Sequence, residues 1–212
     1  MLPTNRGMFI TLEGGEGAGK STNVNYVVDH LGKRGIDCVV SREPGGTPLA
    51  EELREVLLGV RPEPMEPLTE LLLMFAARAQ HIAELIAPAL ASGRWVVCDR
   101  FTDASYAYQG GGRGMDADII ATLERLVQAD LRPDLTIYLD LPVATAVVRI
   151  ADRVHDRIER EQDAFFDAVR SVYRARANAN PRMHIVDASG TLPQVQSEVA
   201  RVLDGFLATG PQ

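Results

Sequence analysis

The chain has 212 residues, of which 46% are hydrophobic, and its formal net charge at pH 7 is −7. This size and composition predict one domain over residues 1–212 with a sizeable core, and the negative charge argues against a broad surface for nucleic acid. The chain has no window of 18 consecutive apolar residues and no apolar segment typical of a secretion signal, so we expect no membrane span and a cytoplasmic protein.

Short apolar runs alternate with longer amphipathic segments along the whole chain. This alternation predicts an α/β fold with a five-stranded parallel sheet and helices on both faces. In such sheets ligands bind at the carboxyl ends of the strands. We expect strands at 8–13, 36–41, 94–99, 134–140 and 183–187, and helices at 19–34, 48–58, 67–92, 103–109, 116–129, 142–154, 158–178 and 192–207.

The first expected strand runs into a glycine-rich loop. Its residues fit the phosphate-binding pattern G-x-x-x-x-G-K-[ST], in which glycines turn backbone N–H groups toward a polyphosphate. Lys20 adds a positive charge at the outer phosphates, and Ser21 offers a hydroxyl to Mg²⁺. A strand before the loop and a helix after it favour a nucleotide site in a three-layer P-loop NTPase fold over an ordinary turn. The predicted ATP-binding residues are Gly14, Gly15, Glu16, Gly17, Ala18, Gly19, Lys20, Ser21 and Thr22.

Charged residues follow the first three expected strands. Glu13 precedes the loop, and its carboxylate either approaches Mg²⁺ or the acceptor phosphate, or caps a turn. Asp99 fits the second acidic element of P-loop enzymes, which organises Mg²⁺, and Arg100 offers a fork for a phosphate; the alternative is a surface ion pair. Arg42 ends the second strand before a Pro-Gly-Gly turn. Arg54, on the next helix, points either to the cleft or to solvent.

Two segments carry side chains suited to a flat base. Phe75 and Arg78 are three residues apart and share one helix face, so the ring can stack on a base while the guanidinium donates to a carbonyl; alternatively Phe75 belongs to the core. Ser105, Tyr108 and Gln109 lie near one another on a short helix and can hydrogen-bond a base or a sugar.

Arginines recur between residues 147 and 160. Arg149, Arg153, Arg157 and Arg160 alternate with acids, which is typical either of a solvated helix face or of a lid that brings an arginine onto a transferring phosphoryl group. The glycine-rich loop supplies Lys20 as its only basic side chain. An added arginine accelerates phosphoryl transfer by roughly 10³–10⁵-fold. Because this segment is the richest source of arginines, we expect it to supply the catalytic one.

Together these motifs resemble those of bacterial thymidylate kinases, which are nucleoside monophosphate kinases of the P-loop class. The resemblance covers about residues 8–207, and the string Arg-Glu-Pro-Gly-Gly-Thr combined with Asp-Arg-Phe is its most specific part. It implies Mg²⁺-dependent transfer of a phosphoryl group from ATP to dTMP, giving ADP and dTDP for dTTP synthesis, by a homodimer. The segments that carry it are 13–22, 42–47, 75–78, 99–101, 108–114, 132–135 and 156–159.

The resemblance also implies a role for each matching residue. Glu13, Ser21 and Asp99 lie on the metal side, and Lys20, Arg100 and a lid arginine, Arg149 or Arg153, act on the phosphates. The acceptor-binding residues are Glu13, Arg42, Phe75 stacked on thymine, Arg78 at its O4 carbonyl, Arg100 at its phosphate, Ser105 and Gln109 at its edge, and Tyr108 beside the sugar where a ribonucleotide has its 2′-hydroxyl.

Two departures from the family pattern stand out. Met74 occupies the position four residues before the arginine where relatives often carry an aromatic, so either Met74 or Phe75 packs on the base. The lid, about 147–160, lacks glycine and leaves both Arg149 and Arg153 as candidates.

Two other functions fit the loop pattern. One is a kinase for guanylate, adenylate or a deoxynucleoside, since base discrimination needs few residues. The other is a P-loop switch or ATP-dependent binding module, although the guanine-reading string Asn-Lys-x-Asp does not occur.

Overall fold

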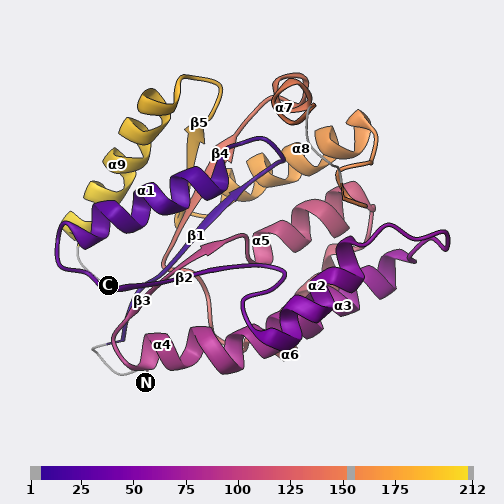
Figure 1. Cartoon of the computed structure of the whole chain (residues 1–212), viewed down its shortest axis with the longest axis horizontal. Coiled ribbons are helices and arrows are strands. Elements are labelled where there is room, and N and C mark those ends of the chain that lie inside the picture. Colours follow the sequence, from indigo (N-terminus) through magenta and orange to yellow (C-terminus); the bar gives the residue numbers. More distant parts are fainter. Residues whose placement is uncertain (1–5, 152–155, 210–212) are drawn as a thin grey trace.

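The computed structural model describes residues 6–151 and 156–209. Their five strands form one sheet in the order β2-β3-β1-β4-β5, and every neighbouring pair is parallel. The predicted parallel α/β fold is therefore confirmed (Figure 1). The strands are β1 (Phe9–Gly14), β2 (Cys38–Arg42), β3 (Trp95–Asp99), β4 (Leu135–Asp140) and β5 (Met183–Asp187).

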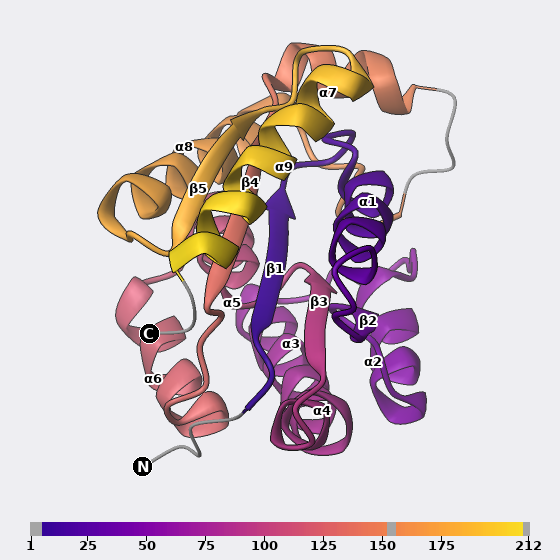
Figure 2. The ribbon, with the colours of Figure 1, turned by 90° about the vertical axis from the view of Figure 1, so that its left-hand side faces the viewer.

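Helices cover both faces of the sheet, as Figures 1 and 2 show. On one face α1 and α9 pack on the strands, and on the other face lie α4, α5 and α8. The helices are α1 (Lys20–Gly32), α2 (Pro48–Leu58), α3 (Pro67–His81), α4 (Ala87–Ala91), α5 (Thr102–Ser105), α6 (Ala117–Gln128), α7 (Val143–Ile150), α8 (Asp163–Ala179) and α9 (Leu192–Thr209), with π-helical turns η1 (Ile82–Ile86) and η2 (Tyr106–Gly112).

The strands β1 and β4 are buried along their whole length. Every residue of β1 and of β4 is buried, as expected where helices cover both faces of a parallel sheet. A polar pair lies within this core, because the hydroxyls of Thr11 and Thr136 share a hydrogen bond of 2.7 Å between β1 and β4. These strands therefore form a rigid base, and their carboxyl ends are fixed in place for a site.

The long helix expected at 67–92 is present, but its middle turn is π-helical. The helices α3 and α4 and the turn η1 between them run on without a break. A π-helical turn also extends α5, so that the short helix expected at 103–109 reaches Gly112.

The prediction of a helix starting at residue 158 is wrong, because α8 begins at Asp163. The carboxylate of Asp156 instead accepts the backbone N–H groups of Ile158 and Glu159 at 2.8 and 2.9 Å, which holds these residues in a turn. At the other end of this region α7 stops at Ile150. Residues 152–154 of the helix expected at 142–154 lie outside the described residues.

Candidate active site

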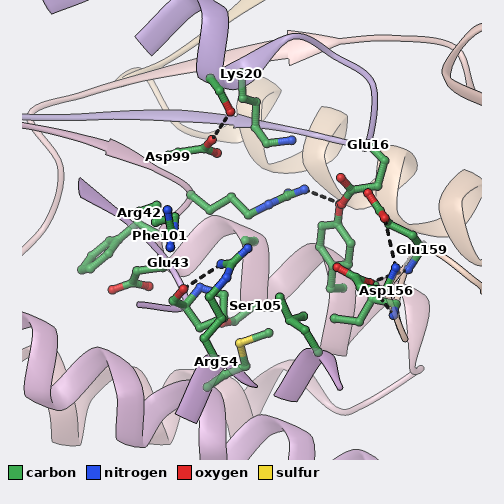
Figure 3. Close-up of a pocket in the computed structure, with 18 of the residues that line it drawn as sticks. Glu16, Lys20, Arg42, Glu43, Arg54, Asp99, Phe101, Ser105, Asp156 and Glu159 are labelled. Atoms are coloured by element: carbon green, nitrogen blue, oxygen red, sulfur yellow. Dashed lines mark hydrogen bonds and ion pairs between the residues drawn. The ribbon is translucent and has the colours of Figure 1, made fainter. Parts of the chain in front are cut away.

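One cavity of about 890 Å³ lies at the carboxyl ends of β1, β2 and β3. Figure 3 shows Lys20 and Asp99 on one side of it and Arg54 and Ser105 on the other. The lining residues are Glu16, Gly17, Gly19 to Thr22, Arg42 to Pro44, Arg54, Leu58, Met74, Arg78, Asp99 to Phe101, Ala104, Ser105, Tyr108, Gln109, Arg149, Ile150, Asp156, Ile158 and Glu159.

The loop between β1 and α1 has the backbone shape that its glycines predict. Gly17 has φ +70°, and a Cβ on Gly14 would lie 2.7 Å from the carbonyl oxygen of Leu139. Lys20 is 9% exposed, and its Nζ donates to the carbonyl of Gly15 at 2.8 Å. Burial and the nearby charge of Arg100 lower the pKa of Lys20. The loop thus holds a cation beside the N-terminus of α1.

The predicted loop residues divide into two groups. Glu16, Gly17 and the run from Gly19 to Thr22 line the cavity. Ala18 is 2% exposed and belongs to the core between the sheet and α1, and Gly14 ends β1. Gly15 lines a smaller neighbouring cavity of about 330 Å³. Backbone groups of these three residues still shape the loop.

Ser21 and Asp99 form a pair that suits Mg²⁺. The Ser21 hydroxyl lies 3.3 Å from Oδ2 of Asp99, while Oδ1 of Asp99 is buried without a hydrogen-bond partner in the described part of the chain. No three His, Cys, Asp or Glu side chains among the described residues gather into a metal cluster. Mg²⁺ commonly takes one or two protein oxygens and completes its shell with phosphate and water, so this donor set fits the ion.

Arg100 occupies the left-handed region with φ +71°, which is uncommon for a residue with a side chain. Its guanidinium donates to the carbonyl of Gly14 at 2.7 Å and to the carboxylate of Glu16 at 2.5 Å, and lies 4.8 Å from the ring centre of Tyr108. The Tyr108 hydroxyl donates to the same Glu16 oxygen at 2.9 Å. The turn after β3 therefore places the guanidinium of Arg100 at the cavity.

Glu13 lies outside the cavity lining, although the sequence suggests it for the metal or the acceptor. It has no exposed surface, and its two oxygens accept the Phe101 N–H and the Tyr173 hydroxyl, each at 2.7 Å. Burial and the charge of Asp103 raise the pKa of Glu13 to about 8. With both oxygens occupied by the protein, this side chain is placed to hold the turn that carries Arg100 rather than to ligate a metal.

Arg78 is buried at the opposite side of the cavity, with one donor nitrogen spare. Its Nε donates to Glu43 at 2.7 Å and its Nη2 to Ser105 at 3.0 Å. Nη1 has no hydrogen-bond partner among the described residues. A buried donor without a partner is costly, so a ligand carbonyl at this position would satisfy it.

Met74 lines the cavity, whereas Phe75 does not. Phe75 is 2% exposed and packs with Leu71 and Ile120, and its ring centre lies 4.6 Å from the Arg78 guanidinium carbon. The structure therefore places Phe75 in the core, behind the arginine. Met74 is the side chain of this pair that can reach a bound base.

Gln109 and Ser105 complete this wall, as the sequence suggests. Both side chains are buried, and both line the cavity together with Tyr108. The Gln109 amide donates to Glu70 at 2.8 Å, which fixes its orientation. The wall is therefore set by hydrogen bonds before a ligand arrives.

Three further arginines reach the cavity. Arg42 is paired with Glu51, and Arg54 donates to the carbonyl of Pro44 at 2.7 Å. Arg149 donates to the carbonyl of Gly17 at 3.4 Å, which puts it beside the loop. Arg153 lies outside the described residues.

Sequence reasoning missed two acidic residues of the lining, Asp156 and Glu159. Residues 156–159 belong to the family resemblance, but their charges alone also fit a solvated face and give no separate signal. Figure 3 shows both near Glu16.

Comparison with known proteins identifies the family. The model of the Thymidylate kinase family matches residues 12–199. The thymidylate kinase of Chromohalobacter salexigens is 59% identical over 207 residues, which is 96% of this chain and 98% of that protein. The thymidylate kinase of Pseudomonas fluorescens is 58% identical over 203 residues, which is 95% of this chain and 97% of that protein.

A solved structure agrees. The crystal structure of thymidylate kinase from Ehrlichia chaffeensis superposes with a TM-score of 0.75 at 34% identity and covers 93% of this chain and 99% of that chain. The chain thus belongs to the thymidylate kinase family, a family of P-loop enzymes that phosphorylate dTMP to dTDP at the expense of ATP.

Proposed function

We propose that the 890 Å³ cavity holds ATP and dTMP end to end, with the phosphates of both between the glycine-rich loop and Arg100. The observation that carries this assignment is that one continuous cavity is lined both by a phosphate-binding loop and by the buried wall of Arg78, Ser105 and Gln109. The loop suits a polyphosphate, and the wall suits a flat base with carbonyl groups.

On the donor side, residues 14–22 hold the ATP phosphates. Backbone N–H groups of the loop and the N-terminus of α1 face the anion, and Lys20 neutralises charge at its outer end. The buried position of Lys20 strengthens this interaction, because little water screens it. Ser21 and Asp99 would hold Mg²⁺, which when bound neutralises the charge of the donor phosphates.

On the acceptor side, the spare Nη1 of Arg78 donates to the O4 carbonyl of thymine. Met74 packs on the base, and Ser105 and Gln109 bond its edge. Tyr108 lies beside the sugar. The Arg100 guanidinium then breaks its hydrogen bond with Glu16 and donates to the phosphate of dTMP, with Arg42 on the same side.

Transfer is direct and in line, since the acceptor phosphate is already an anion and needs no strong base. The protein's contribution is positioning and charge neutralisation by Lys20, Arg100 and one arginine of the segment 147–160. Arg149, which lies beside Gly17, suits this role. Arg153 stays a candidate outside the described residues, and the single-domain boundary 1–212 and the lid stay predictions.

We also propose a homodimer that forms through α3. The segment Pro67–Ala91 is, among the described residues, the one helix long and apolar enough to cross a membrane by length and composition, with 33% of its window buried. Its inner face buries Glu70, Arg78 and His81 against this chain, as in a core helix. Its outer face exposes Leu68 (51%) and Leu72 (49%), which a second copy would cover. A cytoplasmic location stays a prediction.

The experiment is a coupled ADP-release assay with ATP and Mg²⁺, run with dTMP and then with dGMP, dCMP and AMP. We expect ADP formation to depend on dTMP and to fall by more than about tenfold with the other acceptors. Cytosine and adenine present an amino group where the Arg78 donor requires a carbonyl, and guanine, which has a carbonyl, is a larger two-ring base. Slow ATP hydrolysis that dTMP does not stimulate would favour a switch or binding module. Faster turnover with dGMP or AMP would assign another acceptor.

A further inference from the structure

A buried carboxylate lies between the base wall of the cavity and the segment that begins at Asp156. Glu70 of α3 has no exposed surface and is not part of the cavity lining. Its Oε1 accepts the Nε2 of Gln109 at 2.8 Å, and its Oε2 lies 2.7 Å from Nη2 of Arg157 and 3.1 Å from Nη2 of Arg113. Side chains from three separate parts of the chain therefore meet at this one group.

The charge of Glu70 is stabilised by these partners. Burial opposes ionisation, but the hydrogen bond from Gln109, the charge and hydrogen bonds of Arg113 and the nearby guanidinium of Arg157 outweigh it and keep the pKa of Glu70 below its usual value. Arg113 in turn donates to Glu161 at 2.5 Å. A buried anion with this many donors fixes the positions of all of them, because moving any one leaves charge unpaired.

Arg157 connects this cluster to the cavity wall. Its Nε donates to the carbonyl of Leu57 at 2.8 Å, and its backbone N–H donates to Leu58 at 3.1 Å, which ties it to the end of α2. Arg157 itself does not line the cavity, but its neighbours Asp156, Ile158 and Glu159 do. The position of Arg157 thus sets the position of these lining residues.

We propose that Glu70 is a positioning residue that holds Gln109 against the acceptor base and the segment 156–159 along the cavity wall as one unit. This inference rests on the proposed function, because it takes the Gln109 wall to be the thymine site. Glu70 acts through Gln109 and Arg157 and touches neither nucleotide itself.

The kinetic consequence is a selective loss on the acceptor side. ATP is held by the loop amides and Lys20 from another side of the cavity, so its KM stays within about twofold when Glu70 loses its charge. The KM for dTMP rises about tenfold, the effect of one lost hydrogen bond between Gln109 and the base, and kcat falls as the 156–159 wall shifts. A purely structural role would change both KM values alike or neither.

The test compares Glu70→Gln with wild type in the ADP-release assay. Glu198→Gln is the matched control, since it makes the same change at an exposed carboxylate that pairs with Arg201. Arg157→Met is a second variant that leaves Glu70 bonded to Gln109 and Arg113, and it keeps the test available if Glu70→Gln fails to fold. Glu70→Gln is expected to raise the KM for dTMP. Arg157→Met keeps the hold on Gln109 and is expected to lower kcat, because the 156–159 wall shifts. Both variants should leave the KM for ATP in place.

Three results would each overturn the inference: an unchanged KM for dTMP in folded Glu70→Gln, an unchanged kcat in folded Arg157→Met, or equal changes in the KM values for dTMP and ATP. A wild-type protein with no dTMP-dependent turnover would instead contradict the proposed function. Calorimetric titration of dTMP into the folded variants measures binding without turnover. It therefore further distinguishes a failure of this inference from a failure of the proposed function.

Discussion

The hydroxyl of Tyr173 donates to Oε2 of Glu13 across 2.7 Å, and neither side chain has any exposed surface. The other oxygen of Glu13 accepts the N–H of Phe101, the residue after Arg100. The left-handed backbone of Arg100 is thus held by a hydrogen bond on its carboxyl side. The arginine proposed for the acceptor phosphate depends on this buried pair for its place.

Glu13 should make stability depend on pH. Its pKa in the folded protein is about 8, above the ordinary value of 4.5. The folded state therefore binds this proton more tightly than the unfolded state, so the contribution of the group to stability is complete below pH 4.5 and is lost as pH rises through about 8.

Glu13→Gln removes this titration. We expect the free energy of unfolding of wild type, relative to Glu13→Gln, to fall between pH 5.5 and 7.5 with a limiting slope of about 1.4 kcal/mol per pH unit. Urea unfolding at several pH values measures it. A difference between the two proteins that stays constant with pH would contradict the assignment.

Lys20→Ala should reduce turnover by roughly 10²–10³-fold, because a buried cation facing the transferring phosphate is lost. Circular dichroism should show the fold intact, because the hydrogen bond described for the Lys20 side chain is a single one, to the carbonyl of Gly15. Lys33→Ala, an exposed lysine just after α1, is the matched control. Activity close to wild type in Lys20→Ala would remove the loop from the mechanism.

The sequence predicted the fold well because its signals are local and repeated. The strand β5 and the helix α2 have the predicted ends, since apolar runs bounded by Pro and polar residues define both. The start of α8 could not be predicted, because the Asp156 carboxylate and the carbonyls of Leu57 and Leu58 hold the preceding turn. Such tertiary hydrogen bonds leave no periodic trace in the sequence.

The site was predicted in its residue types more than in its geometry. Lys20, Asp99, Arg100 and Arg78 line the cavity as the motifs suggested, because each motif stands at the carboxyl end of a strand or on a helix beside it. Whether Glu13 faces the cavity or the core depends on partners such as Tyr173, which is 160 residues away. Helix periodicity likewise does not tell which of two adjacent residues faces a cavity and which the core.

Substitution should separate Met74 from Phe75. Met74→Ala should raise the KM for dTMP several-fold with little loss of stability, because this side chain lines the cavity. Phe75→Ala should lower the free energy of unfolding by roughly 3–5 kcal/mol, since it leaves a hole beside Leu71 and Ile120. Thermal unfolding and steady-state kinetics on both variants measure the two effects. The reverse pattern would return the stacking role to Phe75.

Arg149→Ala should lower kcat far more than it changes the KM for dTMP, because a contact made in the transition state is lost. A catalytic arginine is worth roughly 10³–10⁵ in rate. Arg153→Ala, assayed alongside, decides between the two candidates. An unchanged kcat in Arg149→Ala with a collapse in Arg153→Ala would move the role to Arg153, and no loss in either would exclude this segment as the source of the catalytic arginine.

Asp99→Asn should raise the Mg²⁺ concentration needed for half-maximal activity, since the unpaired buried Oδ1 and the Ser21 hydroxyl form the proposed metal pair. Titration of Mg²⁺ at fixed ATP measures the shift. Asp116→Asn, at the start of α6, gives the same chemical change at a helix cap outside the cavity lining. Identical Mg²⁺ curves for wild type and Asp99→Asn would remove Asp99 from the metal site.

A crystal structure of the protein with dTMP and a non-hydrolysable ATP analogue tests the central claim most directly. The account predicts the triphosphate on residues 14–22 and the thymine O4 at Nη1 of Arg78, with the dTMP phosphate on Arg100. Either nucleotide bound elsewhere, or a thymine ring that leaves Arg78 without a partner, would contradict it.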